Sequence, residues 1–163
     1  MAGIEVRLED AEATEAFGRR LSACQQVGAL IFLQGDLGAG KTTLVRGYLR
    51  GLGHKGPVKS PTYTLIEPYQ TGQGNLYHLD LYRLSDPEEL EWIGIRDLFD
   101  GESVCLIEWP QRGEGMLPVP DLQVSLVVEG RGRRLTLEAL TACGEQIVDC
   151  IDCEGPDSDI SVA

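Results

Sequence analysis

The sequence lacks any apolar run approaching the ~20 residues that a membrane-spanning helix needs. Its first residues, Met1 to Arg7, also lack the basic stretch followed by an apolar stretch that is typical of a secretion signal. The 163 residues are 42% hydrophobic and 25% charged, a balance typical of one globular domain. We therefore expect a single folded unit in the cytoplasm, with no membrane contact.

Positive charge is scarce, because 14 Lys and Arg stand against 26 Asp and Glu and leave a net charge of −12. A chain this acidic is poorly suited to contact the phosphate backbone of a nucleic acid over a wide surface. We therefore expect no DNA binding and only indirect contact with RNA through a partner. Residues 143–163 hold six acids and no Lys or Arg. This charge, with few bulky apolar side chains, predicts a flexible acidic tail over residues 142–163, after a domain formed by residues 1–141.

Metal-binding and bridging residues are also few. The chain has two histidines and an odd number of cysteines, five, for which we expect free thiols in a reducing compartment. Cys150 and Cys153 form a C-x-x-C pair, but the second pair or the matching histidines that a zinc site needs are missing. A metal site or redox pair in this tail is not favoured.

The most informative stretch is Leu30 to Leu49, which contains the phosphate-binding pattern G-x-x-x-x-G-K-[ST] from Gly35 to Thr42. An apolar run that predicts a buried strand precedes it, and a helical apolar stripe follows it, which is the context that this loop requires. Lys41 is expected to reach the β- and γ-phosphates, and the hydroxyl of Thr42 to bind Mg²⁺. The residues expected to surround the phosphates are Asp36, Leu37, Gly38, Ala39, Gly40, Lys41, Thr42 and Thr43.

Two acids at predicted strand ends can complete such a site. Glu108 follows Val104 to Ile107, and Asp80 follows Leu76 to Leu79. In open α/β sheets ligands lie at the carboxyl ends of the strands. If both strands run parallel to the strand before the phosphate loop, we expect Glu108 to bind the metal or orient water and Asp80 to lie beside it, the alternative being that each is a solvated strand-end acid. Thr62, in the loop after the phosphate-loop helix, is a candidate switch hydroxyl, although a local turn hydrogen bond would equally explain it.

Other side chains near these positions leave two interpretations open. Trp109 can be a core residue or a ligand contact, and His78 more readily packs within its strand than acts in catalysis. Arg112, Arg131, Arg133 and Arg134 can clamp phosphate or stay solvated on the surface.

The nucleotide is expected to be ATP. Guanine-specific proteins of this class carry an Asn-Lys-x-Asp segment, whereas the one asparagine of this chain, Asn75, is followed by Leu. The order of predicted elements favours a single α/β P-loop NTPase domain. It would contain a mixed, mostly parallel sheet flanked by helices and a C-terminal antiparallel hairpin, residues 122–140.

Several separate segments make the chain resemble the TsaE (formerly YjeE) family of bacterial tRNA threonylcarbamoyladenosine biosynthesis proteins over about residues 5–140. They are Gly35-Asp-Leu-Gly-Ala-Gly-Lys-Thr-Thr43, Ser60-Pro-Thr-Tyr-Thr-Leu-Ile-Glu-Pro-Tyr69, Tyr77-His-Leu-Asp-Leu-Tyr-Arg83, Gly94-Ile-Arg-Asp97 and Glu108-Trp-Pro110.

The resemblance implies a small ATPase that binds Mg²⁺ through Thr42 and Glu108, with Asp80 tied to hydrolysis. Together with the loop motif and the switch position, this makes Lys41, Asp80, Glu108 and Thr62 the candidate catalytic residues. The resemblance also implies that Thr14 and Arg133 lie near the adenine. The expected partners are the TsaB and TsaD proteins, which modify the adenosine beside the tRNA anticodon, while the ATPase resets their complex. The segment after about Leu140 departs from the family pattern.

Two other functions are compatible with the same loop. Compact metabolite kinases share its form, but they need an acceptor pocket and usually an Arg-bearing lid, and no acceptor cluster is evident here. A nucleotide-gated binding module would use Asp80 and Glu108 only to hold Mg²⁺.

Overall fold

The computed structural model describes residues 3–25, 27–153 and 160–162. Its strands are β1 (Gly3–Leu8), β2 (Ala29–Gln34), β3 (Ile66–Thr71), β4 (Gly74–Asp80), β5 (Val104–Glu108), β6 (Leu122–Glu129), β7 (Gly132–Ala139) and β8 (Ile160–Val162). Its helices are α1 (Ala11–Ala23), α2 (Lys41–Gly51), α3 (Glu89–Trp92), α4 (Ile95–Leu98), α5 (Ala142–Cys153) and a 3₁₀ turn, η1 (Pro110–Gly113).

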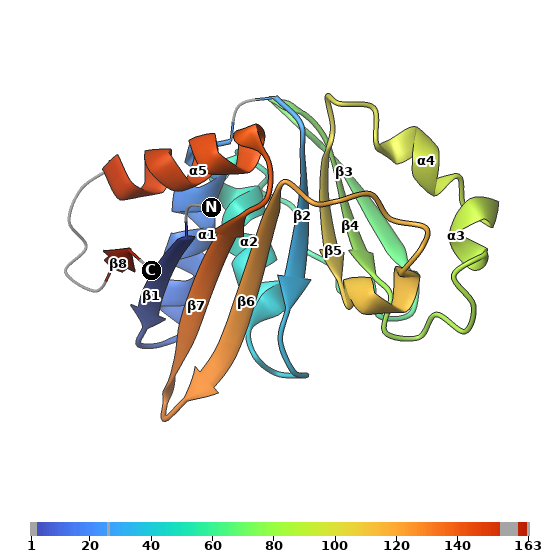
Figure 1. The fold of residues 1–163 in the computed structure, drawn as a ribbon. Helices are drawn as coiled ribbons and strands as arrows, with labels where there is room; N and C mark the ends of the chain where they lie inside the picture. The colour runs from blue at the N-terminus through green and yellow to red at the C-terminus, as the bar shows by residue number, and fades with distance from the viewer. Residues whose placement is uncertain (1–2, 26, 154–159, 163) are drawn as a thin grey trace.

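All the described strands form one sheet in the order β3-β4-β5-β2-β6-β7-β1-β8 (Figure 1). The four central strands, β4, β5, β2 and β6, run parallel, and β3, β7 and β8 are antiparallel to their neighbours. The predicted single α/β domain with a mixed sheet, a parallel centre and a C-terminal hairpin is therefore confirmed.

Helices cover the two faces of the sheet unequally. The larger core joins α1, α2 and α5 to one face, and a smaller core joins α3 and α4 to the other face at the β4–β5 end (Figure 1). The alternation of apolar side chains sets this division, since Ile31 and Leu33 of β2 enter the larger core while Leu30 enters the smaller one. The central parallel strands are thus buried on both faces, and their carboxyl ends converge on the phosphate loop.

The prediction of a flexible tail is wrong for Ala142–Cys153, which forms α5. The acids of this helix face solvent, while Ile147, Val148 and Ile151 enter the larger core. These three apolar residues have helical spacing, which outweighs the acidic composition. β8 then pairs with β1, and residues 154–159 of the predicted tail lie outside the described residues.

The expectation of free thiols is also wrong for two cysteines. Cys24, at the end of α1, and Cys150, on α5, form a disulfide across 126 positions of sequence. Their proximity results from the packing of α1 beside α5, which the sequence pattern does not reveal. Cys105, Cys143 and Cys153 are free.

Among the described residues, none of the helices combines the length and apolar character needed to cross a membrane.

Candidate phosphate site

The phosphate loop connects the end of β2 to the start of α2. Gly38 and Gly40 have φ angles of 80° and 105°, a region that side-chain-bearing residues rarely adopt, so the two glycines allow the tight turn. No side chain of the described residues caps α2 at Gly40, and the first N–H groups of the helix remain available to an anion. The loop is therefore built to receive phosphate oxygens.

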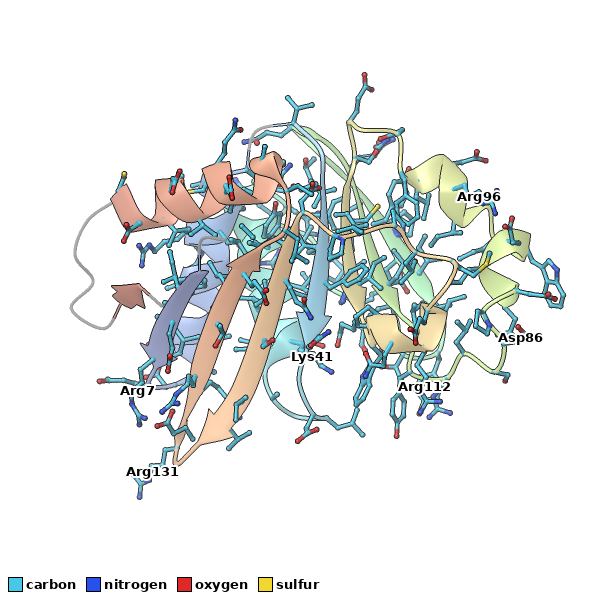
Figure 2. The ribbon with its side chains drawn as sticks, viewed as in Figure 1. Arg7, Lys41, Asp86, Arg96, Arg112 and Arg131 are labelled. Carbon is cyan, nitrogen blue, oxygen red and sulfur yellow. A yellow bond between two sulfur atoms is a disulfide. The ribbon has the colours of Figure 1, made fainter. Side chains whose placement is uncertain are left out.

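Lys41 begins α2 and extends its ammonium group across the loop (Figure 2). Its Nζ donates to the Gly35 carbonyl at 2.6 Å, lies 3.8 Å from Glu108 Oε1, and sits 4.3 Å from the centre of the Trp109 ring. Burial lowers the pKa of this amine, while the charges of Glu108, Asp80 and Asp36 oppose the shift. The ammonium is thus held at the loop by a carbonyl, a carboxylate and an aromatic face.

The two predicted acids lie side by side. β4 and β5 are parallel with Asp80 opposite Glu108 in the register, so both carboxylates reach the same edge of the sheet. Asp80 accepts hydrogen bonds from the Thr62 hydroxyl at 3.3 Å and from the Tyr82 amide at 2.9 Å. Thr62 therefore reaches the site directly and ties the loop after α2 to the end of β4.

These groups surround one pocket of about 250 Å³. Its lining includes Leu37, Gly38, Gly40, Lys41, Thr42, Thr43, Thr62, Asp80, Glu108 and Trp109. Trp109 adopts a left-handed backbone conformation, with φ 55°, which turns its half-buried ring toward Lys41 and Tyr82. Of its two interpretations, the structure favours the one at the pocket.

Thr14 and Arg133 lie at a second, smaller pocket on the other side of Gly40, with a volume of about 150 Å³. Arg133 donates to the carbonyl oxygens of Ala39 at 2.8 Å and Gly38 at 3.2 Å, so it braces the phosphate loop from outside. Thr14 is buried and donates to the Asp10 carbonyl. The loop contacts of Arg133 could not be inferred from sequence, because they join residues more than 90 positions apart.

The donor chemistry of the first pocket suits Mg²⁺ bound together with phosphates. Thr42 and Glu108 offer oxygen ligands, and no group of three or more His, Cys, Asp or Glu within the described part of the chain could hold a metal alone. Mg²⁺ characteristically uses one or two carboxylates, waters and substrate phosphates rather than a cage made only of protein. The arrangement fits a metal that arrives with a nucleotide.

His78 is the residue that the sequence interpretation undervalued. It is fully buried on β4, and its Nε2 lies 2.6 Å from Glu108 Oε2. Its alternation with Asp80 along the strand is the signal that could have placed it on the face of the site.

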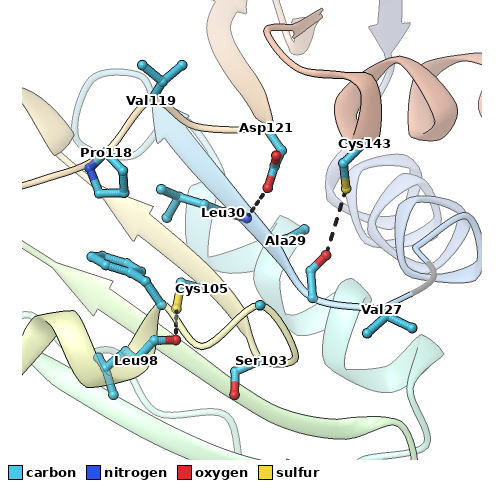
Figure 3. A pocket seen from close by; sticks show the side chains of 13 residues that line it. Val27, Ala29, Leu30, Leu98, Ser103, Cys105, Pro118, Val119, Asp121 and Cys143 are labelled. Carbon is cyan, nitrogen blue, oxygen red and sulfur yellow. Dashed lines mark hydrogen bonds between the residues drawn. The ribbon is translucent and has the colours of Figure 1, made fainter.

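A larger pocket of about 360 Å³ lies at the opposite end of the central strands (Figure 3). Its polar side chains engage neighbouring backbone: Asp121 accepts from the Leu30 amide, Cys105 donates to the Leu98 carbonyl and Cys143 to the Gly28 carbonyl. Its walls are mainly apolar, so size alone does not make it the chemical site.

The fold and the loop together define a P-loop protein of the α/β class. A model of the family "Threonylcarbamoyl adenosine biosynthesis protein TsaE" matches residues 8–135, and the chain belongs to this family.

Relatives span most of the chain. The tRNA threonylcarbamoyladenosine biosynthesis protein TsaE of Haemophilus influenzae is 54% identical over 119 residues, 73% of this chain and 75% of that protein. The protein of the same name from Bacillus subtilis is 40% identical over 134 residues, 82% of this chain and 84% of that protein. The crystal structure of B. subtilis YdiB is similar with a TM-score of 0.80 and 32% identity, covering 93% of this chain and 96% of that one.

Proposed function

We propose that this chain binds and hydrolyses Mg·ATP at the phosphate loop, and that hydrolysis serves the threonylcarbamoyladenosine modification of tRNA. The observation that carries the proposal is the convergence of Lys41, Asp80 and Glu108 on one pocket beside an uncapped helix N-terminus. Membership in the TsaE family supports the link to tRNA modification.

Each residue has a distinct part in this proposal. Lys41 exchanges its contact with the Gly35 carbonyl for the terminal phosphate oxygens. Thr42 and Glu108 would hold Mg²⁺, which when bound would neutralise charge on the nucleotide phosphates. Asp80, whose carboxylate is fixed by Thr62 and Tyr82, orients the attacking water.

The adenosine end extends from the loop toward the second pocket. Thr14 lines that pocket, and Arg133 keeps the loop in shape beside it. The absence of an Asn-Lys-x-Asp segment favours adenine over guanine.

The partners in this proposal are TsaB and TsaD, in the cytoplasm, with tRNA reached only through them. The acidic balance of the chain agrees with this indirect role. Hydrolysis would then drive a step of the partner complex rather than the chemistry on the base.

Phosphate release from purified protein tests the proposal. We expect slow, Mg²⁺-dependent release from ATP by the chain alone and a faster rate after addition of purified TsaB and TsaD. A metabolite kinase would instead yield a phosphorylated small molecule, detectable by mass spectrometry in cell extract, without dependence on those partners. ATP binding with no phosphate release under either condition would reduce the chain to a binding module and contradict the proposal.

A further inference from the structure

His78 lies directly behind the acidic edge of the phosphate site. Its side chain is fully buried and lies on the same face of β4 as Asp80. In the parallel register His78 is opposite Leu106 and Asp80 is opposite Glu108, so the imidazole approaches Glu108 from two residue pairs deeper in the sheet. This step places Nε2 2.6 Å from Oε2 of Glu108.

The contact divides the Glu108 carboxylate between two environments. Oε2 points inward to His78, whereas Oε1 points to the pocket, 3.8 Å from Lys41 Nζ. Rotation of the carboxylate about its last side-chain bond would break the hydrogen bond between Oε2 and His78. Because that bond holds Oε2, Oε1 keeps a fixed direction. The imidazole therefore determines which oxygen Glu108 presents at the phosphate loop.

Packing alone does not account for a histidine here. Its Nδ1 is buried and has no hydrogen-bond partner among the described residues, which is uncommon for a buried polar atom. Leu76 and Leu79 on the same strand are equally buried, so an apolar side chain would fill such a position without leaving a polar atom unpaired. The tautomer that donates from Nε2 leaves Nδ1 as an unpaired acceptor. Within the described part of the chain, the one hydrogen bond of the ring is therefore that to Glu108.

The geometry points to His78 as the positioning residue for Glu108, setting the oxygen that this acid offers to the metal of a bound Mg·nucleotide. The inference rests on the proposed function, since it requires a nucleotide-borne metal at Glu108. Hydrogen-bond partners behind a metal ligand typically change metal affinity about 10- to 100-fold when they are removed. His78 touches neither nucleotide nor metal in this scheme and acts only through Glu108.

The test compares His78→Gln with His78→Met, which are close in shape but differ in the N–H donor. ATP affinity of each full-length variant is measured by titration calorimetry twice, in excess Mg²⁺ and in EDTA. We expect the gain in ATP affinity due to Mg²⁺ to fall about tenfold or more in His78→Met, with EDTA affinity within about twofold of the parent. His78→Gln should recover most of the gain, because its amide can donate to Oε2.

Leu76→Val is the matched control, since Leu76 is as buried as His78 and makes no hydrogen bond to Glu108. It should lower the stability to urea while keeping the gain in ATP affinity due to Mg²⁺.

The inference is overturned if His78→Met keeps this gain in ATP affinity, or if Leu76→Val loses it equally. Should His78→Met fail to fold, His78→Gln still decides, because loss of the gain in a folded His78→Gln contradicts the inference and its retention supports it. A parent protein that binds no ATP in either buffer would instead overturn the proposed function.

Discussion

Lys41 makes a structural hydrogen bond at the position where we propose that it contacts the nucleotide. Its side chain is 5% exposed, and its ammonium already donates to the Gly35 carbonyl before any phosphate arrives. Burial lowers its pKa, and the nearby Glu108, Asp80 and Asp36 resist that change. A triphosphate would therefore replace a weak acceptor with a strongly charged one at a preformed position.

From this exchange we predict that Lys41→Met weakens ATP binding by about 10- to 100-fold, since hydrogen bonds to charged groups contribute about 1.5–3 kcal/mol. Titration calorimetry with Mg·ATP measures the change. Lys55→Met, at an exposed lysine beyond α2, is the control and should bind like the parent. Equal affinity of the parent and Lys41→Met for Mg·ATP would show that Lys41 does not contribute to nucleotide binding.

A second prediction concerns Cys105, whose burial raises its pKa to about 12, with Asp100 adding to the shift. At pH 8 only about one Cys105 thiol in ten thousand would be ionised, so thiol reagents should modify the exposed Cys153 and leave Cys105 intact in folded protein.

The same raised pKa predicts a pH dependence of stability. Between pH 9 and 12 the Cys105 thiol loses its proton in the unfolded chain before it does so in the folded protein, so the free energy of unfolding should fall as pH rises. Peptide mapping after labelling, and urea titrations with Cys105→Ala as reference, test both parts. Labelling of both cysteines at similar rates would contradict the first.

At the scale of elements, α1 and α2 approach so closely that glycines line their contact. A Cβ at Gly47 would lie 1.9 Å from the Glu15 carbonyl oxygen, and one at Gly18 would lie 2.3 Å from the Leu44 carbonyl oxygen. Backbone cannot yield as a flexible side chain can. The position of α2, and with it that of the phosphate loop, thus depends on residues 18 and 47 being glycines, which have no side chain.

We therefore predict that Gly47→Ala lowers the free energy of unfolding by about 1–3 kcal/mol, although alanine favours a helix by about 1 kcal/mol. Gly72→Ala, in a turn with nothing within 4 Å of the added atom, should change it by less than about 0.5 kcal/mol. Urea unfolding followed by circular dichroism measures both. A neutral Gly47→Ala would mean that the helices can separate freely.

The disulfide between α1 and α5 carries a third stability prediction. Because Cys24 and Cys150 close a loop of 126 positions, Cys150→Ser should lower the free energy of unfolding by about 2–5 kcal/mol. Parent protein in reductant should approach the variant, whereas Cys153→Ser, at a free and exposed thiol, should behave as the parent. Identical urea midpoints for parent and Cys150→Ser without reductant would show that the bridge stabilises nothing.

The sequence predicts those parts of the structure that depend on local pattern or on parallel strands. The phosphate loop follows from its spacing, and the proximity of Asp80 to Glu108 follows once both strands run with β2. The partners of His78 and Arg133 could not be predicted, because they depend on strand register and on contacts across the chain. The helix α5 was missed for a different reason, since acidic composition concealed the apolar spacing of Ile147 and Ile151.

At the scale of the whole molecule, the distribution of charge limits what the protein can bind directly. Several basic side chains of the β6–β7 hairpin region are already paired. Arg134 contacts Glu5 and Glu129, and Arg7 also contacts Glu129. Arg133 is committed to the phosphate loop. These arginines form no open basic surface, and the net charge of −12 repels a polyanion at long range.

Direct binding to nucleic acid requires neutralised phosphates and released counterions, which give non-specific dissociation constants of about 10⁻⁴–10⁻⁶ M for suitable proteins. An acidic chain should bind more weakly, with a dissociation constant above that range. We therefore predict no detectable retention of tRNA by this protein alone at about 0.15 M salt in a filter-binding assay up to about 100 μM protein. Addition of TsaB and TsaD should bring the chain into a tRNA-containing complex, detected by co-sedimentation with labelled tRNA. Tight, salt-sensitive binding by the isolated chain would show that a local basic surface overrides the global charge, and the indirect route to tRNA would then be wrong. The partner-dependent result is expected because the chain would contribute the proposed nucleotide site, while the positive surface that tRNA needs would come from another protein.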